Sequence, residues 1–274
     1  MKRRLRFQFT IVLSVLSFHA FAQSILLPPK NGSVYVIAHR GAHNGIPENS
    51  LAAYQKAIDL GCDFVEIDLR TTKDNQLVSI HNSTIDDYVN GKTGEVREMS
   101  LEELKKLDIG EKAGKEWKNT RIPTFIEILD LCQDKIGIYL DLKDGDPEEI
   151  ITQMKKYNME HRIVWYIPAS HHKSLMEIKQ LCRKCLIMPN PGPTKNIERV
   201  AVAYQPKVIA TDMGELSKSF VQIAHENEAM VFVDDHEDDP KKWEAEWRKI
   251  IDWGTDGIQT DHPEELIRYL RKDK

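Results

Sequence analysis

The chain has 274 residues, and its 43 Asp and Glu outnumber its 38 Lys and Arg, so its net charge is −5 at pH 7. Proteins that bind DNA or anionic lipid by general electrostatic attraction carry clustered Lys and Arg, and an acidic chain lacks that attraction. Nucleic acid is therefore excluded as a partner. The acidic balance suits instead a site that gathers carboxylates around a cation.

The first 22 residues have the order of a secretory signal peptide. Basic residues within Lys2–Arg6 precede a mostly apolar run, Phe7–Phe18, and Ala20–Ala22 forms an A-x-A cleavage site. A transmembrane anchor is the alternative, but polar residues break this run, which falls short of the ~20 residues that span a bilayer. We therefore expect export, to the periplasm or the medium, with no stable membrane anchor after cleavage.

Cleavage would leave one domain, residues 23–274, with a net charge of −9 because the leader holds four bases and no acids. These 252 residues exceed an average domain of about 150, but α/β barrels commonly run to about 250 residues as one unit. Nine short apolar runs are predicted strands: Val34–His39, Phe64–Leu69, Leu77–His81, Ile136–Leu142, Arg162–Ile167, Cys185–Met188, Lys207–Thr211, Met230–Asp234 and Gly257–Thr260.

Nine strands are one more than an eight-stranded barrel needs. A parallel crossover takes about a dozen residues or more, and only seven, residues 70–76, separate the second predicted strand from the third. The third strand, Leu77–His81, should therefore run antiparallel beside the second as a hairpin arm. Eight strands remain for a parallel sheet.

Helices are predicted in most of the connections: Ser50–Leu60, with Ser50 as N-cap and Gly61 just past its end, Pro123–Gln133, Pro147–Tyr157, Ser170–Leu181, Gly214–Glu226 and Pro240–Trp253. Alternating β and α elements favour a parallel sheet covered by helices, and eight repeats favour closure into a (β/α)8 TIM barrel. A doubly wound open sheet is the alternative. Residues 82–122, which include one helical piece at Ser100–Leu107, are expected to form an insertion over the barrel mouth, with too few apolar residues for a core of its own.

Acidic side chains gather on two of the predicted strands. Because side chains alternate between the two faces of a strand, Glu66 and Asp68 are expected to point into the barrel, as is Asp141. One such acid is often an ordinary hydrogen-bonded polar group, but three together repel unless one takes up a proton or a cation binds. Ligation by oxygen alone suits Ca²⁺ or Mg²⁺ better than zinc. The sequence therefore predicts one divalent cation here.

Two histidines end neighbouring elements of the same region. His39 closes the first strand, and His81 should fall roughly opposite Asp68, beside the predicted metal. A single histidine at a strand end is more often structural than catalytic, but two beside a cation suit general acid–base chemistry, since imidazole titrates near pH 6.5. Arg40 and Lys143 would supply positive charge for an anion such as phosphate. Together these groups predict hydrolysis of a phosphodiester.

These residues lie in motifs that resemble the glycerophosphodiester phosphodiesterase family, whose members are TIM barrels. The matching segments are H-R-G-A…P-E-N-S within His39–Ser50, G-C-D-F-V-E-I-D-L at Gly61–Leu69, V-S-I-H ending at His81, Y-L-D-L-K at Tyr139–Lys143 and D-G-I-Q-T-D-x-P at Asp256–Pro263. The resemblance implies that His39 and His81 form an acid–base pair and that Glu66, Asp68 and Asp141 bind the metal. It also implies that Arg40 and Lys143 bind phosphate and that Glu48 supports the site.

Three departures from the family pattern stand near the site. Asp141 replaces the usual Glu, Asn82 replaces the Asp that usually follows His81, and Val-Phe-Val-Asp at Val231–Asp234 replaces Trp-Thr-Val-Asn. These changes leave the phosphate chemistry intact and leave the alcohol open. Together with the predicted signal peptide, the resemblance implies an exported, metal-dependent enzyme that hydrolyses small glycerophosphodiesters to glycerol 3-phosphate and an alcohol. The alternatives are a phospholipase D-like enzyme that acts on lysophospholipid or sphingolipid headgroups, and a non-catalytic barrel that binds phosphorylated ligands or glycans.

Cys182 and Cys185 form a C-x-x-C spacing. A zinc site would need a second pair of ligands at suitable spacing, which the sequence lacks. A disulfide, which requires an oxidising compartment, and a pair of ordinary buried thiols remain equal expectations.

Overall fold

The computed structural model describes residues 26–235 and 237–272, so the predicted signal peptide lies outside the described residues. All nine predicted strands are present. They are β1 (Tyr35–Ala38), β2 (Phe64–Thr71), β3 (Leu77–Ser79), β4 (Gly137–Leu142), β5 (Ile163–Pro168), β6 (Leu186–Asn190), β7 (Val208–Asp212), β8 (Met230–Asp234) and β9 (Gly257–Thr260).

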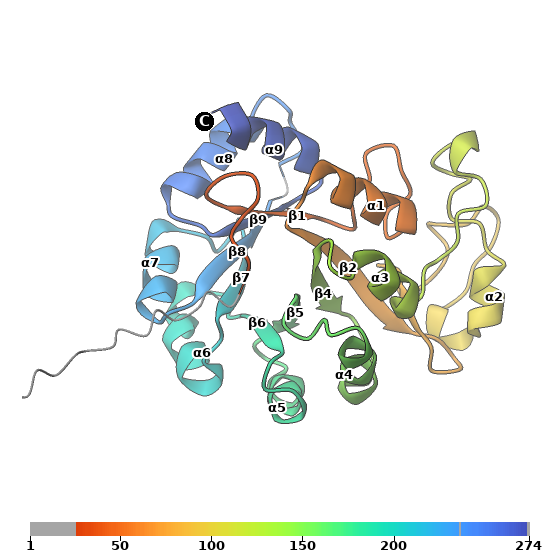
Figure 1. Ribbon diagram of the computed structural model, residues 1–274, viewed down its shortest axis with the longest axis horizontal. Helices are drawn as coiled ribbons and strands as arrows, with labels where there is room; N and C mark the ends of the chain where they lie inside the picture. The colour runs from red at the N-terminus through yellow and green to blue at the C-terminus, as the bar shows by residue number, and fades with distance from the viewer. Residues whose placement is uncertain (1–25, 236, 273–274) are drawn as a thin grey trace, which may run out of the picture.

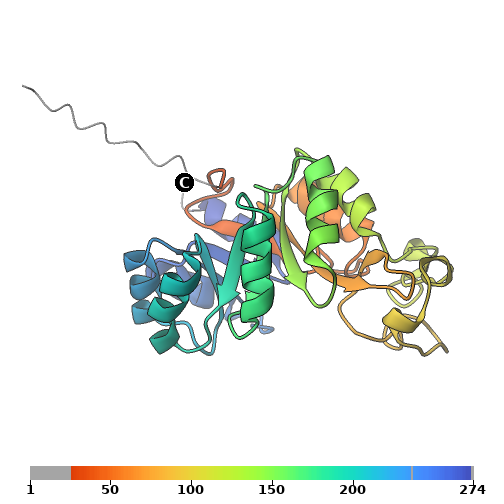
Figure 2. The ribbon, with the colours of Figure 1, turned by 90° about the horizontal axis from the view of Figure 1, so that it is seen from below.

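Eight of the strands form one parallel sheet with the hydrogen-bonded order β6-β5-β4-β2-β1-β9-β8-β7. The strands at the two ends of this order, β6 and β7, lie beside each other, so the sheet curves into a nearly closed barrel. Helices surround it on the outside (Figures 1 and 2). The ninth strand, β3, pairs antiparallel with β2, as the short connection predicts. The (β/α)8 barrel is therefore confirmed, and the open-sheet alternative is wrong.

The helices are α1 (Leu51–Leu60), α2 (Leu101–Lys105), α3 (Phe125–Cys132), α4 (Pro147–Lys156), α5 (His172–Leu181), α6 (Ile197–Tyr204), α7 (Lys218–Glu226), α8 (Trp243–Asp252) and α9 (Pro263–Lys272). The predicted caps of α1 are confirmed: the Ser50 side chain accepts from the amide of Ala53, and Gly61 is left-handed at φ +80°. Helix α6 was not predicted, because a Pro-Gly-Pro segment precedes it and no side chain caps its start. In the part of the chain that the structure describes, no helix has both the length and the apolar character to cross a bilayer.

Side chains of each strand alternate between two apolar layers. On β2, Val65 and Ile67 point outward and pack under the helices, whereas Phe64 points into the barrel. The inward rings of Tyr35, Phe64 and Phe232 pack against one another with centroids 5.5–5.8 Å apart. These rings fill the barrel interior, so the inward acids of β2 have aromatic packing beneath them.

Two inward glycines make room for these rings. A Cβ atom on Gly137 would lie 2.5 Å from the Phe64 ring, and one on Gly257 would lie 2.6 Å from the Phe232 ring. Real Cβ atoms do not approach that closely, so both positions require glycine. The aromatic layer inside the barrel is therefore built from strands that are far apart in the sequence, β1, β2 and β8.

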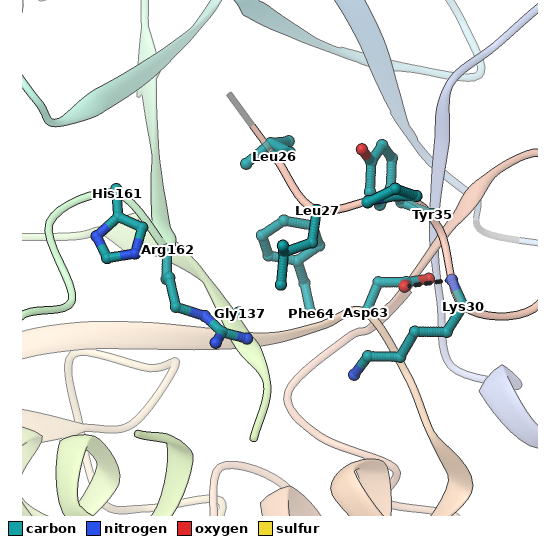
Figure 3. A pocket seen from close by; sticks show the side chains of 10 residues that line it. Leu26, Leu27, Lys30, Tyr35, Asp63, Phe64, Gly137, His161 and Arg162 are labelled. Atoms are coloured by element: carbon teal, nitrogen blue, oxygen red, sulfur yellow. Dashed lines mark hydrogen bonds between the residues drawn. The ribbon is translucent and has the colours of Figure 1, made fainter. Parts of the chain in front are cut away.

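The amino ends of the strands border a cavity of about 220 Å³ (Figure 3). Leu26, Phe64 and Arg162 are among the residues that line it, and the amide of Lys30 donates to Asp63 there at 2.8 Å. This cavity lies at the opposite end of the barrel from the carboxyl ends of β2 and β4. It is not the place where the predicted catalytic residues meet.

The insertion, residues 82–122, contains α2 and two 3-10 helices, Val96–Glu98 and Lys115–Trp117, and lies beside α1 and α3 (Figure 1). A separate cluster of nine buried apolar side chains holds it together: Val78, Ile80, Ile85, Val89, Val96, Leu104, Leu107, Ile109 and Ile122. The expectation that the insertion lacks a core of its own is therefore wrong. The prediction counted only the apolar residues of the insertion, whereas the core also includes Val78 and Ile80 of the hairpin arm.

Cys182 and Cys185 form a disulfide between the end of α5 and the start of β6, with Cα atoms 5.4 Å apart. Cys62 and Cys132 are buried free thiols. The disulfide decides between the two expectations that the sequence left equal.

Candidate active site

Three acids meet at the carboxyl ends of β2 and β4. The parallel register pairs Asp68 with Asp141. Glu66 lies two residues earlier on β2, on the same inward face and deeper in the barrel. One oxygen from each of the three carboxylates lies within 4.8 Å of the others. Glu66 is 2% exposed and Asp68 is 1% exposed, while Asp141 is partly exposed. The structure thus brings together the three acids that the sequence predicted as metal ligands.

Burial makes three ionised carboxylates costly in this place. It raises the pKa of Glu66 well above the ordinary value, and the charges of Asp68 and Asp141 raise it further. Burial also raises the pKa of Asp141, while the nearby Lys143 and His81 oppose that rise. The cluster therefore needs added positive charge or a proton to be stable.

Lys143 supplies one positive charge to this cluster. Its Nζ lies 2.6 Å from Oδ2 of Asp141 and 3.1 Å from Oδ1 of Asp68. Three carboxylates and one ammonium leave a net charge of −2, which a divalent cation would balance. The donor set is all oxygen, as Ca²⁺ and Mg²⁺ prefer, so these residues fit the predicted ion.

A tight turn after β1 carries Arg40 to the same cluster. Arg40 has φ +49°, and its amide donates to Oε2 of Glu66 at 2.7 Å. Gly41 follows at φ +86°, where a Cβ atom would lie 2.7 Å from Cβ of Ala53 in α1. The turn thus requires glycine at position 41, because its positive φ and the close approach of α1 both disfavour a side chain there.

The Arg40 side chain links the acids to the loop before α1. Its Nη1 lies 3.0 Å from Oε2 of Glu48, and its Nε lies 3.6 Å from Oδ2 of Asp68. The other carboxylate oxygen of Glu48 accepts a hydrogen bond from the Tyr88 hydroxyl at 3.0 Å. Glu48 therefore ties Arg40 to the insertion, and these residues border a second cavity of about 410 Å³ between the loop and the insertion.

His39 is supported by a carboxylate that the sequence reasoning did not assign. Its Nδ1 lies 2.7 Å from Oδ1 of Asp261, which directly follows β9, the neighbour of β1. His43 lies 3.6 Å from the same oxygen. Burial alone would raise the pKa of Asp261, but the hydrogen bond and the charges of the two histidines outweigh it and lower that pKa to about 2. An acid directly after the last predicted strand, Gly257–Thr260, was the available signal.

His81 lies one residue past the position opposite Asp68, which fits the prediction that it falls roughly opposite that acid. The amide of Ile80 donates to the carbonyl of Asp68 at 3.0 Å, so Ile80 stands opposite Asp68. The guanidinium of Arg70 donates twice to the His81 carbonyl, at 3.0 and 2.7 Å. His81 nevertheless remains close enough to the cluster for its charge to affect Asp141.

Asn49 orients Asp68 through a buried network that the sequence reasoning also missed. Its Nδ2 donates to Oδ2 of Asp68 at 2.7 Å, and its Oδ1 accepts from the hydroxyls of Tyr54 at 2.8 Å and Ser79 at 2.9 Å. All four residues are buried. Partners of this kind hold a ligand side chain in place and tune the metal that it binds.

Comparisons with known proteins identify the family of this chain. The model of the glycerophosphoryl diester phosphodiesterase family matches residues 39–265. A curated glycerophosphodiester phosphodiesterase of Caldanaerobacter subterraneus subsp. tengcongensis is 34% identical over 249 residues, which cover 86% of this chain and 98% of the relative. Another, from Bacillus subtilis, is 28% identical and covers 99% of each chain.

Two solved structures share the fold. A glycerophosphodiester phosphodiesterase from Agrobacterium tumefaciens superposes with a TM-score of 0.76 at 24% identity, covering 86% of this chain and 99% of that one. A phosphodiesterase of Oleispira antarctica, solved with the product sn-glycerol 3-phosphate, gives a TM-score of 0.74 at 24% identity and covers 86% and 96%. The sequence match over most of its length and this shared barrel place the chain in the glycerophosphoryl diester phosphodiesterase family.

Proposed function

We propose that the protein hydrolyses glycerophosphodiesters to glycerol 3-phosphate and an alcohol, with one divalent cation held by Glu66, Asp68 and Asp141. The observation that carries the proposal is the buried cluster of these three acids, with Arg40 and Lys143 at its edge. A phosphodiester is an anion, and its hydrolysis needs positive charge beside the phosphoryl oxygens and groups that transfer protons to and from the reacting oxygens. The product bound in the Oleispira relative supports this substrate class.

Each group of residues has a separate role in the proposed reaction. A cation at the acids would polarise a phosphoryl oxygen and offset its charge. Arg40 and Lys143 would bind the non-bridging oxygens and hold the phosphorus in line with the attacking oxygen. Of His39 and His81, one accepts the proton of the attacking oxygen and the other donates a proton to the oxygen of the departing alcohol. The attacking oxygen belongs either to water or to the substrate's own 2-hydroxyl, and in the second case water then opens the cyclic phosphate. Asp261 holds the ring of His39 by its Nδ1 during this transfer.

We also propose that the mature protein works outside the cytoplasm, in the periplasm or the medium. The basic and apolar order of residues 1–22 supports export. The disulfide between Cys182 and Cys185 supports an oxidising compartment.

Glycerophosphocholine should be hydrolysed faster than lysophosphatidylcholine. An enzyme for lipid headgroups needs an apolar surface near its mouth, and among the described residues the exposed large apolar side chains, Leu27, Ile126, Leu181 and Val202, lie outside the insertion. Release of choline from each diester measures the rates. Faster hydrolysis of lysophosphatidylcholine would favour the headgroup enzyme, and no hydrolysis of any diester would favour the non-catalytic barrel.

Replacing His39 or His81 by Ala should lower kcat by about 10²- to 10⁴-fold, because each would remove one proton-transfer group. Both side chains are partly exposed, so the fold should remain intact by circular dichroism. His161→Ala is the matched control, since this exposed histidine borders the cavity at the other end of the barrel. Wild-type kcat in either active-site variant would disprove the acid–base assignment.

Chelation should abolish turnover, and Ca²⁺ or Mg²⁺ should restore it and raise the melting temperature more at pH 8 than at pH 5. The folded pKa values of Glu66 and Asp141 are raised, so their ionisation destabilises the metal-free fold as pH rises from the unfolded value near 4.3 toward the raised values. Binding needs the ionised acids, so the ion removes this penalty. Differential scanning calorimetry measures the shift. A shift of equal size in Asp141→Asn would contradict the assignment.

A further inference from the structure

Asn82 contacts the ring of His81 directly. Nδ1 of His81 lies 2.8 Å from Oδ1 of Asn82, the next residue along the chain. Both side chains are half-buried at the end of the hairpin arm. The two hydrogen bonds from Arg70 to the His81 carbonyl fix the backbone beneath the ring, so Asn82 is the contact that acts on the ring itself.

The other end of the Asn82 amide defines which atom faces the histidine. Its Nδ2 donates to Oδ2 of Asp87 at 2.7 Å. An ionised carboxylate can only accept hydrogen bonds, so the NH₂ group of Asn82 must face Asp87 and its carbonyl oxygen must face His81. A carbonyl oxygen also only accepts, so Nδ1 of His81 must carry a proton and donate it.

We propose that Asn82 and Asp87 are positioning residues that hold the His81 ring in the tautomer with its proton on Nδ1. If the protein has the proposed function, on which this assignment rests, Nε2 is the nitrogen of His81 that faces the reaction. Nδ1 keeps its proton throughout. Nε2 either takes the proton of the attacking oxygen and later returns it to water, or gives a proton to the departing alcohol and later regains one from water. The proton count on the ring is therefore restored at the end of each cycle.

The two histidines of the site are supported in different ways. Nδ1 of His39 contacts the carboxylate of Asp261 directly, at 2.7 Å. Nδ1 of His81 contacts a neutral amide, and the carboxylate of Asp87 stands behind that amide. We call the chain of hydrogen bonds Asp87–Asn82–His81 the relay. The relay orients the His81 ring, as Asp261 orients the His39 ring.

Asn82 also has a structural contact, which the experiment must separate from the relay. Its backbone amide donates to the hydroxyl of Tyr88 at 3.2 Å, and that contact belongs to the main chain. A side-chain substitution at Asn82 leaves the backbone donor in place. The relay, in contrast, depends on the amide side chain alone.

Asn82→Ala should lower kcat on glycerophosphocholine by roughly 10- to 100-fold with little change in KM, as loss of an orienting partner typically does. The double variant Asn82→Asp with Asp87→Asn should recover most of this loss, because the new carboxylate can accept from both the ring and the new amide. Ser83→Ala, at the exposed next position, is the matched control and should keep wild-type kcat.

Nitrogen-15 NMR of the neutral ring gives a readout that does not depend on activity. Wild type and the double variant should show His81 with its proton on Nδ1, and Asn82→Ala should show a mixture of the two tautomers. His81→Gln identifies the signals. Lower kcat in Asn82→Ala without a change of tautomer would overturn the proposal, as would wild-type kcat in that variant. If wild type hydrolyses no diester but Asn82→Ala changes the tautomer, the relay stands and the proposed function fails.

Discussion

Three carboxylates buried within 4.8 Å of one another are the constraint on which this end of the barrel depends. Burial raises the pKa of Glu66 and of Asp141, and the charges of the neighbouring acids raise both further, so the cluster needs positive charge beside it. The surrounding residues place a positive charge and hydrogen-bond donors beside these acids. Lys143 reaches two of the acids, the amide of Arg40 donates to Glu66, and Asn49 donates to Asp68.

The barrel supplies this arrangement because parallel strands end together. The register between β2 and β4 sets Asp68 beside Asp141, although 72 residues separate them in the chain. The pairing of β1 with β9 likewise brings Asp261 to His39. The hairpin arm adds His81 from outside the ring of eight strands, and the insertion that grows from the arm supplies Asp87 and further partners. The proposed catalytic groups at the carboxyl ends are thus held by elements that pack beneath and beside them.

Strand period and connection length predicted the barrel, the hairpin arm and the inward acids, because these follow from alternation and chain reach alone. Asn49 and Asp261 were missed because their importance comes from contacts between distant elements, which no local pattern contains. The one-residue offset of His81 arises from the exact pairing of the arm, which composition does not determine. The core of the insertion was missed because it borrows Val78 and Ile80 from that arm.

The account depends on a cation bound by all three acids, and the position of a bound ion tests this most directly. Mn²⁺ also prefers oxygen ligands and can be located by its anomalous scattering in crystals soaked at pH 8. The account predicts one Mn²⁺ ion coordinated by oxygens of Glu66, Asp68 and Asp141. An ion bound elsewhere in the barrel with no peak at these three acids would contradict it.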